Sequence, residues 1–136
     1  MCAFQLSVLQ RNAALDGLET DAGATLVLKI KTGAPPATCA TADSGTVLVT
    51  ITCPADSFAA ASSGSKAKNG TWQDTSADNT GTAAHFRLYK SDGTTCCQQG
   101  TVTATGGGGD MTLDSTSITA GQTVTISTYT ISAANS

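Results

Sequence analysis

The sequence is poor in charge and nearly free of histidine. Charged residues make up 12% of the chain, about half the share of roughly 25% that is usual in globular domains. The seven lysines and arginines are scattered, and ten acidic residues outnumber them. No basic stripe can therefore release counterions from a nucleic acid. We expect no nucleic-acid partner.

Long apolar runs are also missing. No stretch of 18 apolar residues occurs, so we expect no membrane-spanning helix and no membrane partner. The first ten residues lack a basic segment and are interrupted by polar side chains, which does not fit a signal peptide. We expect synthesis in the cytoplasm, and residence there or in a particle assembled there.

The single histidine, His85, limits acid–base catalysis. The alternation of its segment predicts that it lies on the outward face of a strand, beside Arg87. A cysteine–histidine nucleophile pair is conceivable, but no flanking motif supports it. Paired carboxylates for glycoside hydrolysis would come from loops that lack aromatic platforms. We therefore predict that the protein is not an enzyme and has no catalytic residues.

The cysteine count is odd, and no CxxC motif occurs. We expect free thiols that behave as small hydrophobic side chains in a reducing compartment. Two of the cysteines are adjacent, but on a strand they point to opposite faces and cannot chelate one ion together. The residues are Cys2, Cys39, Cys53, Cys96 and Cys97.

Two acidic loops could supply oxygen ligands for calcium. Their spacing matches no EF-hand, and Asp and Asn are ordinary turn formers. We therefore predict no metal and no cofactor, with surface calcium as the alternative. The loops contain Asp74, Asp78 and Asn79, and Asp110 and Asp114.

One helix is expected, over residues 5–22. Ser7 and Gln10 fit a capping box, and Gly23 is a suitable C-terminal stop. An apolar stripe at helical spacing should lie against the rest of the protein. It consists of Phe4, Val8, Leu15 and Leu18.

After Gly23 the apolar period changes from 3.6 to 2, which predicts strands. Leu26, Leu28 and Ile30 should form one buried face. A hairpin is expected over residues 84–103 with a turn at Ser91–Gly93, and Gly106–Gly109 should be a flexible hairpin connection. We predict one domain, 1–136, whose residues 24–136 form a β-sandwich or jelly roll of about eight short antiparallel strands.

The last segment changes parity. Val124 and Ile126 share one face, whereas Tyr129 and Ile131 share the other. A β-bulge near Ser127 would keep both pairs buried.

Without a catalytic constellation, function should reside in surfaces. Arginine and tryptophan are enriched at interface hot spots, so Arg11, Trp72 and Arg87 are the candidate interface residues. Trp72 also has a simpler explanation as a core anchor, because so few large side chains are available.

Three stretches resemble small virion proteins of tailed phages. They are Arg11–Asp16, residues 80–94 (TGTAAHFRLYKSDGT) and residues 113–126 (LDSTSITAGQTVTI). The chain is similar over most of its length to head decoration or cement proteins with a jelly-roll fold, such as the cement protein of a short-tailed Bordetella phage.

The resemblance implies a structural protein on the capsid exterior, assembled in the host cytoplasm. Its expected partners are the phage major capsid protein and a second copy of itself in a homodimer. It would clamp neighbouring capsid subunits and stabilise the mature head. The alternative is a tail- or fibre-associated module that binds a host receptor or glycan.

Overall fold

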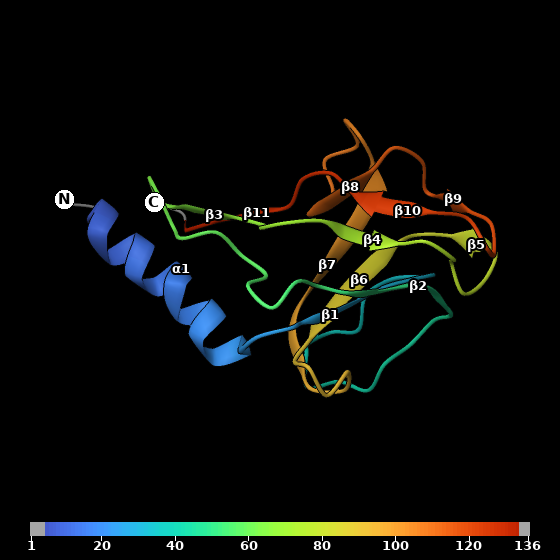
Figure 1. Cartoon of the computed structure of the whole chain (residues 1–136), viewed down its shortest axis with the longest axis horizontal. Coiled ribbons are helices and arrows are strands. Elements are labelled where there is room, and N and C mark those ends of the chain that lie inside the picture. The colour runs from blue at the N-terminus through green and yellow to red at the C-terminus, as the bar shows by residue number, and fades with distance from the viewer. Residues whose placement is uncertain (1–4, 134–136) are drawn as a thin grey trace.

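The computed structural model describes residues 5–133, which form one helix and eleven short strands (Figure 1). Helix α1 spans Val8–Ala22 and begins three residues later than the predicted range of 5–22. The predicted cap is present, because the side chain of Ser7 accepts a hydrogen bond from the backbone N–H of Gln10. It ends at Gly23, which has a φ of 84° and donates its N–H to the carbonyl of Glu19. A positive φ of this size costs glycine little.

The predicted apolar stripe of α1 is only partly buried. Leu15 is 3% exposed, but Val8 is 45% and Leu18 is 42% exposed; Phe4 lies outside the described residues. The expectation that the whole stripe lies against the protein is therefore wrong for these two side chains. Val8 and Leu18 remain exposed because α1 packs against a narrow two-stranded ribbon instead of a broad sheet.

The main sheet has five strands in the order β2-β1-β6-β7-β8. Its core face carries the side chains that the alternation predicted, with Leu28, Ile30 and Leu88 at 0% exposure. The predicted hairpin is β6 and β7, joined by a turn in which Asp92 accepts from the backbone of Thr94 and Thr95. The strands are β1 Val27–Lys31, β2 Val47–Thr52, β6 His85–Tyr89, β7 Cys96–Ala104 and β8 Met111–Leu113.

One pairing in this sheet is parallel, which corrects the expectation of antiparallel strands throughout. β7 and β8 run side by side with Val102 opposite Met111. The glycine run makes the short return possible, because Gly106 and Gly108 have φ of 89° and 81°. These angles are strained for any other residue. Gly106–Gly109 is thus a tight loop between parallel neighbours and not a hairpin connection.

Opposite the main sheet lies the pair β10–β4, and the remaining strands form two more pairs, β5–β9 and β11–β3. Side chains from both layers form one core, in which Trp72 of β4 and Ile126 of β10 are 0% exposed. The expected all-β sandwich with a leading helix is confirmed at this level. The strands are β3 Ser65–Ala67, β4 Trp72–Asp74, β5 Gly81–Thr82, β9 Ser117–Ile118, β10 Val124–Ile126 and β11 Thr130–Ser132.

The parity change in the last segment marks a break between two strands. β10 pairs with β4 and β11 pairs with β3, so the predicted β-bulge within one strand is wrong. The position of the disruption was predicted correctly. Both pairs belong to one long ribbon that leaves the sandwich where the strands are interrupted.

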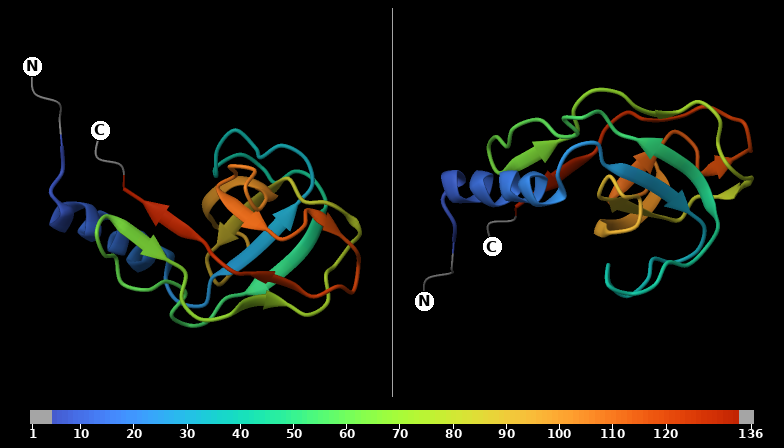
Figure 2. Two further views of the ribbon diagram at one scale, coloured as in Figure 1. Left: turned by 90° about the horizontal axis from the view of Figure 1, so that it is seen from above. Right: turned by 60° about the horizontal axis from the view of Figure 1, so that its bottom comes forward.

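The outer part of this ribbon carries the helix away from the sandwich. We call α1, β3 and β11 together the arm; Figure 2 shows it projecting from one side of the body. Lys66 of β3 holds the helix, because its ammonium lies 2.7 Å from Asp16 and 2.6 Å from Glu19. The burial of the Lys66 side chain, which is 1% exposed, makes this pairing structurally necessary.

The base of the arm is an aromatic cluster. Four of the six aromatic residues of the chain meet there. Tyr129, which immediately precedes β11, contacts Phe58, Trp72 and Phe86 with ring centroids 6.2, 6.0 and 5.5 Å away. Such contacts stabilise beyond their buried area, so the arm is anchored to the core where it departs.

Candidate interaction surfaces on the arm and the covering loop

The outer face of the main sheet is covered by the loop at residues 33–46. His85 is 0%, Arg87 3% and Tyr89 1% exposed, so the predicted surface exposure of His85 and Arg87 is wrong. The alternation itself holds, but a polar loop covers the face that it predicted to be exposed. The His85 ring places Nδ1 2.7 Å from the carbonyl of Gly33 at the start of this loop.

Asp43 closes the loop over two buried cations. Its carboxylate lies 2.7 Å from Lys31 Nζ and 2.5 Å from an Arg87 nitrogen, and it accepts a 2.7 Å bond from the Tyr89 hydroxyl. Partial burial raises the pKa of Asp43, but the bonds from Lys31 and Tyr89 and the nearby positive charges outweigh it, and the pKa falls to about 2. The carboxylate is therefore ionised at ordinary pH values and balances one of the two positive charges.

Arg87 is fully occupied within the chain. Besides Asp43, it donates to the carbonyls of Thr38 and Thr41 at 2.9 and 2.8 Å and to the side chain of Gln99 at 3.0 Å. The guanidinium thus organises the covering loop. Its burial removes the reason for choosing Arg87 as an exposed interface residue.

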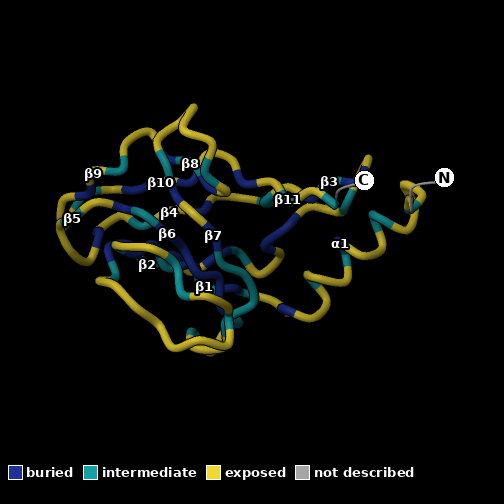
Figure 3. Tube along the Cα trace, turned by 180° about the vertical axis from the view of Figure 1, so that it is seen from behind, coloured by how far each residue is buried: buried dark blue, intermediate teal, exposed yellow. Residues whose placement is uncertain are grey.

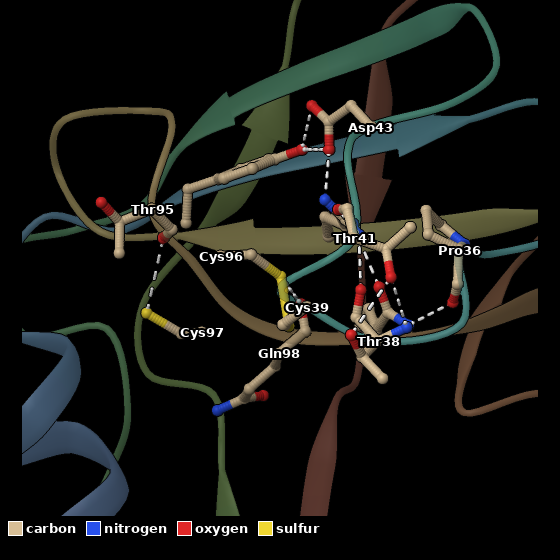
Figure 4. Close-up of a disulfide and its surroundings, with 12 residues drawn as sticks. Pro36, Thr38, Cys39, Thr41, Asp43, Thr95, Cys96, Cys97 and Gln98 are labelled. Atoms are coloured by element: carbon tan, nitrogen blue, oxygen red, sulfur yellow. Dashed lines mark hydrogen bonds and ion pairs between the residues drawn. A yellow bond between two sulfur atoms is a disulfide. The ribbon is translucent and has the colours of Figure 1, made fainter.

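A disulfide pins the same loop to β7. Cys39 and Cys96 are bonded, with Cα atoms 5.4 Å apart (Figure 4). The prediction of free thiols is wrong for this pair and confirmed for Cys53 and Cys97; Cys2 lies outside the described residues. Cys97 points away from the bond toward the carbonyl of Thr95, as expected for adjacent residues of a strand. A separation of 57 residues leaves no spacing motif by which sequence could have found the pair.

The other two candidate interface residues differ in exposure. Trp72 is buried at 0% exposure and donates its indole N–H to the carbonyl of Asn69 at 3.2 Å, so it is a core anchor. Arg11 is partly exposed on α1 and reaches the carbonyl of Ala133 at 3.5 Å. It lies within the arm and ties the helix to the end of β11.

The acidic loops bond to the protein's own backbone. Asp74 accepts from the N–H groups of Thr50 and Ser76, and Asp78 accepts from the hydroxyl of Thr50. Asp110 accepts from the N–H of Thr101. These contacts favour the turn-forming role. Within residues 5–133, no group of three or more His, Cys, Asp or Glu side chains is placed to hold a metal ion.

The arm is the most exposed apolar element. Leu9 is 80% exposed, and with Val8 and Leu18 it leaves much of α1 uncovered; Figure 3 shows the helix largely exposed. Open cavities flank α1 on both sides. One of about 510 Å³ is bordered by Asp16, Glu19 and Lys66. The other, of about 440 Å³, is bordered by Leu18 and by β7 and β11.

In the described part of the chain, no helix has the length and apolarity needed to cross a membrane. Comparison with family models, curated proteins and solved structures gave no match.

Proposed function

We propose that this protein is a structural virion protein that binds the outside of a phage capsid lattice and cements neighbouring major capsid subunits. The observation that carries the proposal is the arm. It projects from the body and exposes three large apolar side chains, Val8, Leu9 and Leu18. Single exposed apolar residues are common on monomeric proteins, but three on one protruding helix, with Leu9 on the side opposite Leu18, support contact with a partner.

The low charge of the chain supports the same role. Interface cores are depleted in charged residues, and charged residues form only 12% of this chain. The resemblance of residues 80–94 and 113–126 to cement proteins adds the expected partner. As part of this proposal, we assign the sandwich to the jelly-roll class and the protein to a homodimer on the capsid exterior.

The mechanism is thermodynamic. A protein that binds only the expanded lattice stabilises that lattice by mass action. In a homodimer, binding of one arm raises the effective concentration of the other at its own site. Modest apolar contacts from each arm therefore suffice for stable attachment when they are summed over a capsid shell.

The test is co-sedimentation of the purified protein with procapsids and with expanded heads of the phage that encodes it. We expect saturable binding to expanded heads and a higher temperature of head disruption. Leu9→Gln should weaken binding without unfolding, because the side chain is 80% exposed. Ala120→Gln, in the exposed turn after β9 at the opposite end of the molecule, is the matched control (Figure 1).

Absence of binding to either form of head contradicts the proposal. The tail- or fibre-associated module then becomes the hypothesis to test, with tail fractions and glycan arrays. Equal loss of binding in Leu9→Gln and Ala120→Gln also contradicts the role given to the arm.

A further inference from the structure

We infer that the groove between β11 and β7 binds an extended segment of a partner protein, which adds to the arm as a new strand. The inference deepens the proposed function, because the partner that it implies is the capsid subunit beneath the protein.

One wall of the groove is an unpaired strand edge. Among the described strands, β11 pairs only with β3. The outer edge of β3 is itself occupied, since the N–H of Ala59 donates to the carbonyl of Ala67 and Ser62 bridges to Ser65. Within the ribbon, the side of β11 remote from β3 is therefore where another strand can be added.

The hydrogen-bonding pattern shows which backbone groups that edge presents. The carbonyl of Tyr129 accepts from the backbone N–H of Lys68, and the N–H of Ala133 donates to the carbonyl of Gly64. The peptide groups of Tyr129 and Ala133 therefore point toward β3. Peptide groups alternate along an antiparallel strand. The N–H and C=O groups of Thr130 and Ser132 consequently face the other way, and both residues border the cavity of about 440 Å³.

The opposite wall is a second incomplete edge. β8 pairs with β7 only over Val102–Ala104, and the next outward N–H, that of Thr101, is taken by the side chain of Asp110. Beyond this point Gln98 and Gln99 of β7 border the groove. At one end the groove is closed by the carboxylate of Asp110. From there it runs between the edges of β11 and β7.

Apolar side chains border the groove together with polar ones. The apolar ones are Phe86, Tyr129 and Ile131, with Leu18 of α1. Apolar side chains beside unpaired peptide groups match a β-strand, which presents backbone bonds at its edge and side chains on alternate faces. Asp110 is the one charged residue among the described residues that border the cavity. The occupant is therefore an extended segment with alternating small apolar side chains and a neutral or slightly basic charge.

The edge can be closed with little disturbance to the fold. Ser132→Pro removes an N–H that faces the groove, and proline is tolerated on the open side of an edge strand. Ser132→Ala is the matched control, because both variants lose the contact between the hydroxyls of Ser132 and Ser65 and only one loses the N–H. Circular dichroism and thermal unfolding confirm that both remain folded.

The first experiment uses the isolated protein and a capped peptide of alternating threonine and valine with a terminal lysine. We expect amide chemical-shift changes at Thr130 and Ser132 and slower hydrogen exchange there. Affinity should fall about tenfold in Ser132→Pro, since a lost hydrogen bond and a steric block act together, and should persist in Ser132→Ala. Two further peptides carry methyl groups on alternate peptide nitrogens, one on the odd and one on the even positions. The peptide whose methylated nitrogens face β11 should not bind.

Shift changes elsewhere, or equal affinity of the two variants, overturn the inference. So does a concentration-dependent dimer that Ser132→Pro dissociates, because a second copy would then occupy the edge.

The second experiment repeats head co-sedimentation with both variants. Weaker binding of Ser132→Pro alone supports the capsid subunit as the source of the strand, and equal binding of both variants overturns that assignment. If the wild-type protein fails to sediment with heads, the proposed function fails, while the peptide experiment still decides whether the groove binds a strand.

Discussion

Asp43 provides a quantitative test of the covered sheet face. Asp43→Asn removes the carboxylate that forms ion pairs with Lys31 and Arg87, which are 2% and 3% exposed. Breaking a buried ion pair from one side costs about 3–5 kcal/mol. The Asp43 side chain is itself 45% exposed, so water screens part of the interaction and we expect a loss of about 2–3 kcal/mol.

The same cluster predicts a pH dependence. The pKa of Asp43 in the folded protein is about 2, below the ordinary aspartate value of 3.8. A depressed pKa of a carboxyl group stabilises the fold above the unfolded pKa and loses this contribution as pH falls through the folded pKa. The stability difference between wild type and Asp43→Asn should therefore be full above about pH 4 and shrink progressively toward pH 2.

The assay is urea unfolding of the oxidised protein at pH 7, 4, 3 and 2, with Asp114→Asn as an exposed control that also removes one negative charge. A change of about 2–3 kcal/mol corresponds to a midpoint shift of roughly 6–12 °C in a parallel thermal experiment on a domain of this size. If Asp43→Asn lies within about 0.5 kcal/mol of Asp114→Asn, which is the scatter of ordinary surface substitutions, the account of the buried cations is wrong.

Three further predictions concern the sulfur atoms and the aromatic cluster. Replacing Cys39 and Cys96 together by serine should cost up to about 4 kcal/mol, the chain-entropy value for their separation of 57 residues; a urea midpoint equal to that of the oxidised wild type would contradict this. Tyr129→Phe removes the 2.9 Å hydrogen bond from the hydroxyl to the side chain of Gln98 and should lower the free energy of unfolding in urea by about 1 kcal/mol. Tyr129→Ala should lower it by about 3–5 kcal/mol. Similar losses in the two variants would refute the importance of the ring contacts. Burial raises the pKa of the Cys53 thiol to about 12. In a variant that keeps only Cys53 and Cys97 as free thiols, an aromatic disulfide reagent at pH 8 should therefore modify half-exposed Cys97 first. Faster labelling of Cys53 would show that the core opens.

The sequence predicted the local elements well because their signals are local. The capping pair at Ser7 and Gln10 and the glycine at position 23 define the helix. Period-2 alternation correctly placed Leu28 and Ile30 in the core. These features depend on a few neighbouring residues, whose conformational preferences do not need the rest of the fold.

The features that sequence could not predict depend on distant segments. Arg87 and Tyr89 occupy the face that alternation predicts to be exposed, and only the loop carrying Asp43 buries them. The disulfide likewise joins the loop to β7 across 57 residues. Alternation distinguishes the two faces of a strand, but it does not tell whether a polar loop covers the second face.

The candidate surfaces follow the same division. The exposure of Leu18 and Val8 could not be predicted, because their helical spacing is that of a buried stripe. The groove beside β11 depends on which strands remain unpaired, and this is a property of topology. The glycine run offered a usable signal, since consecutive glycines permit sharp changes of chain direction, but the direction of β8 does not follow from it.

The arm is built from segments that are far apart in the sequence, and this affects how the chain folds. Its helix comes from one end of the described sequence and β11 from the other, so the hydrogen bond between Arg11 and Ala133 joins residues 122 positions apart. Contacts between distant segments incur loop-closure entropy before they contribute stability. The sandwich should therefore form first and the arm dock onto it last, with a lower free energy of local opening than the core strands. A binding element that assembles last remains unavailable to partners until the body that carries it is complete.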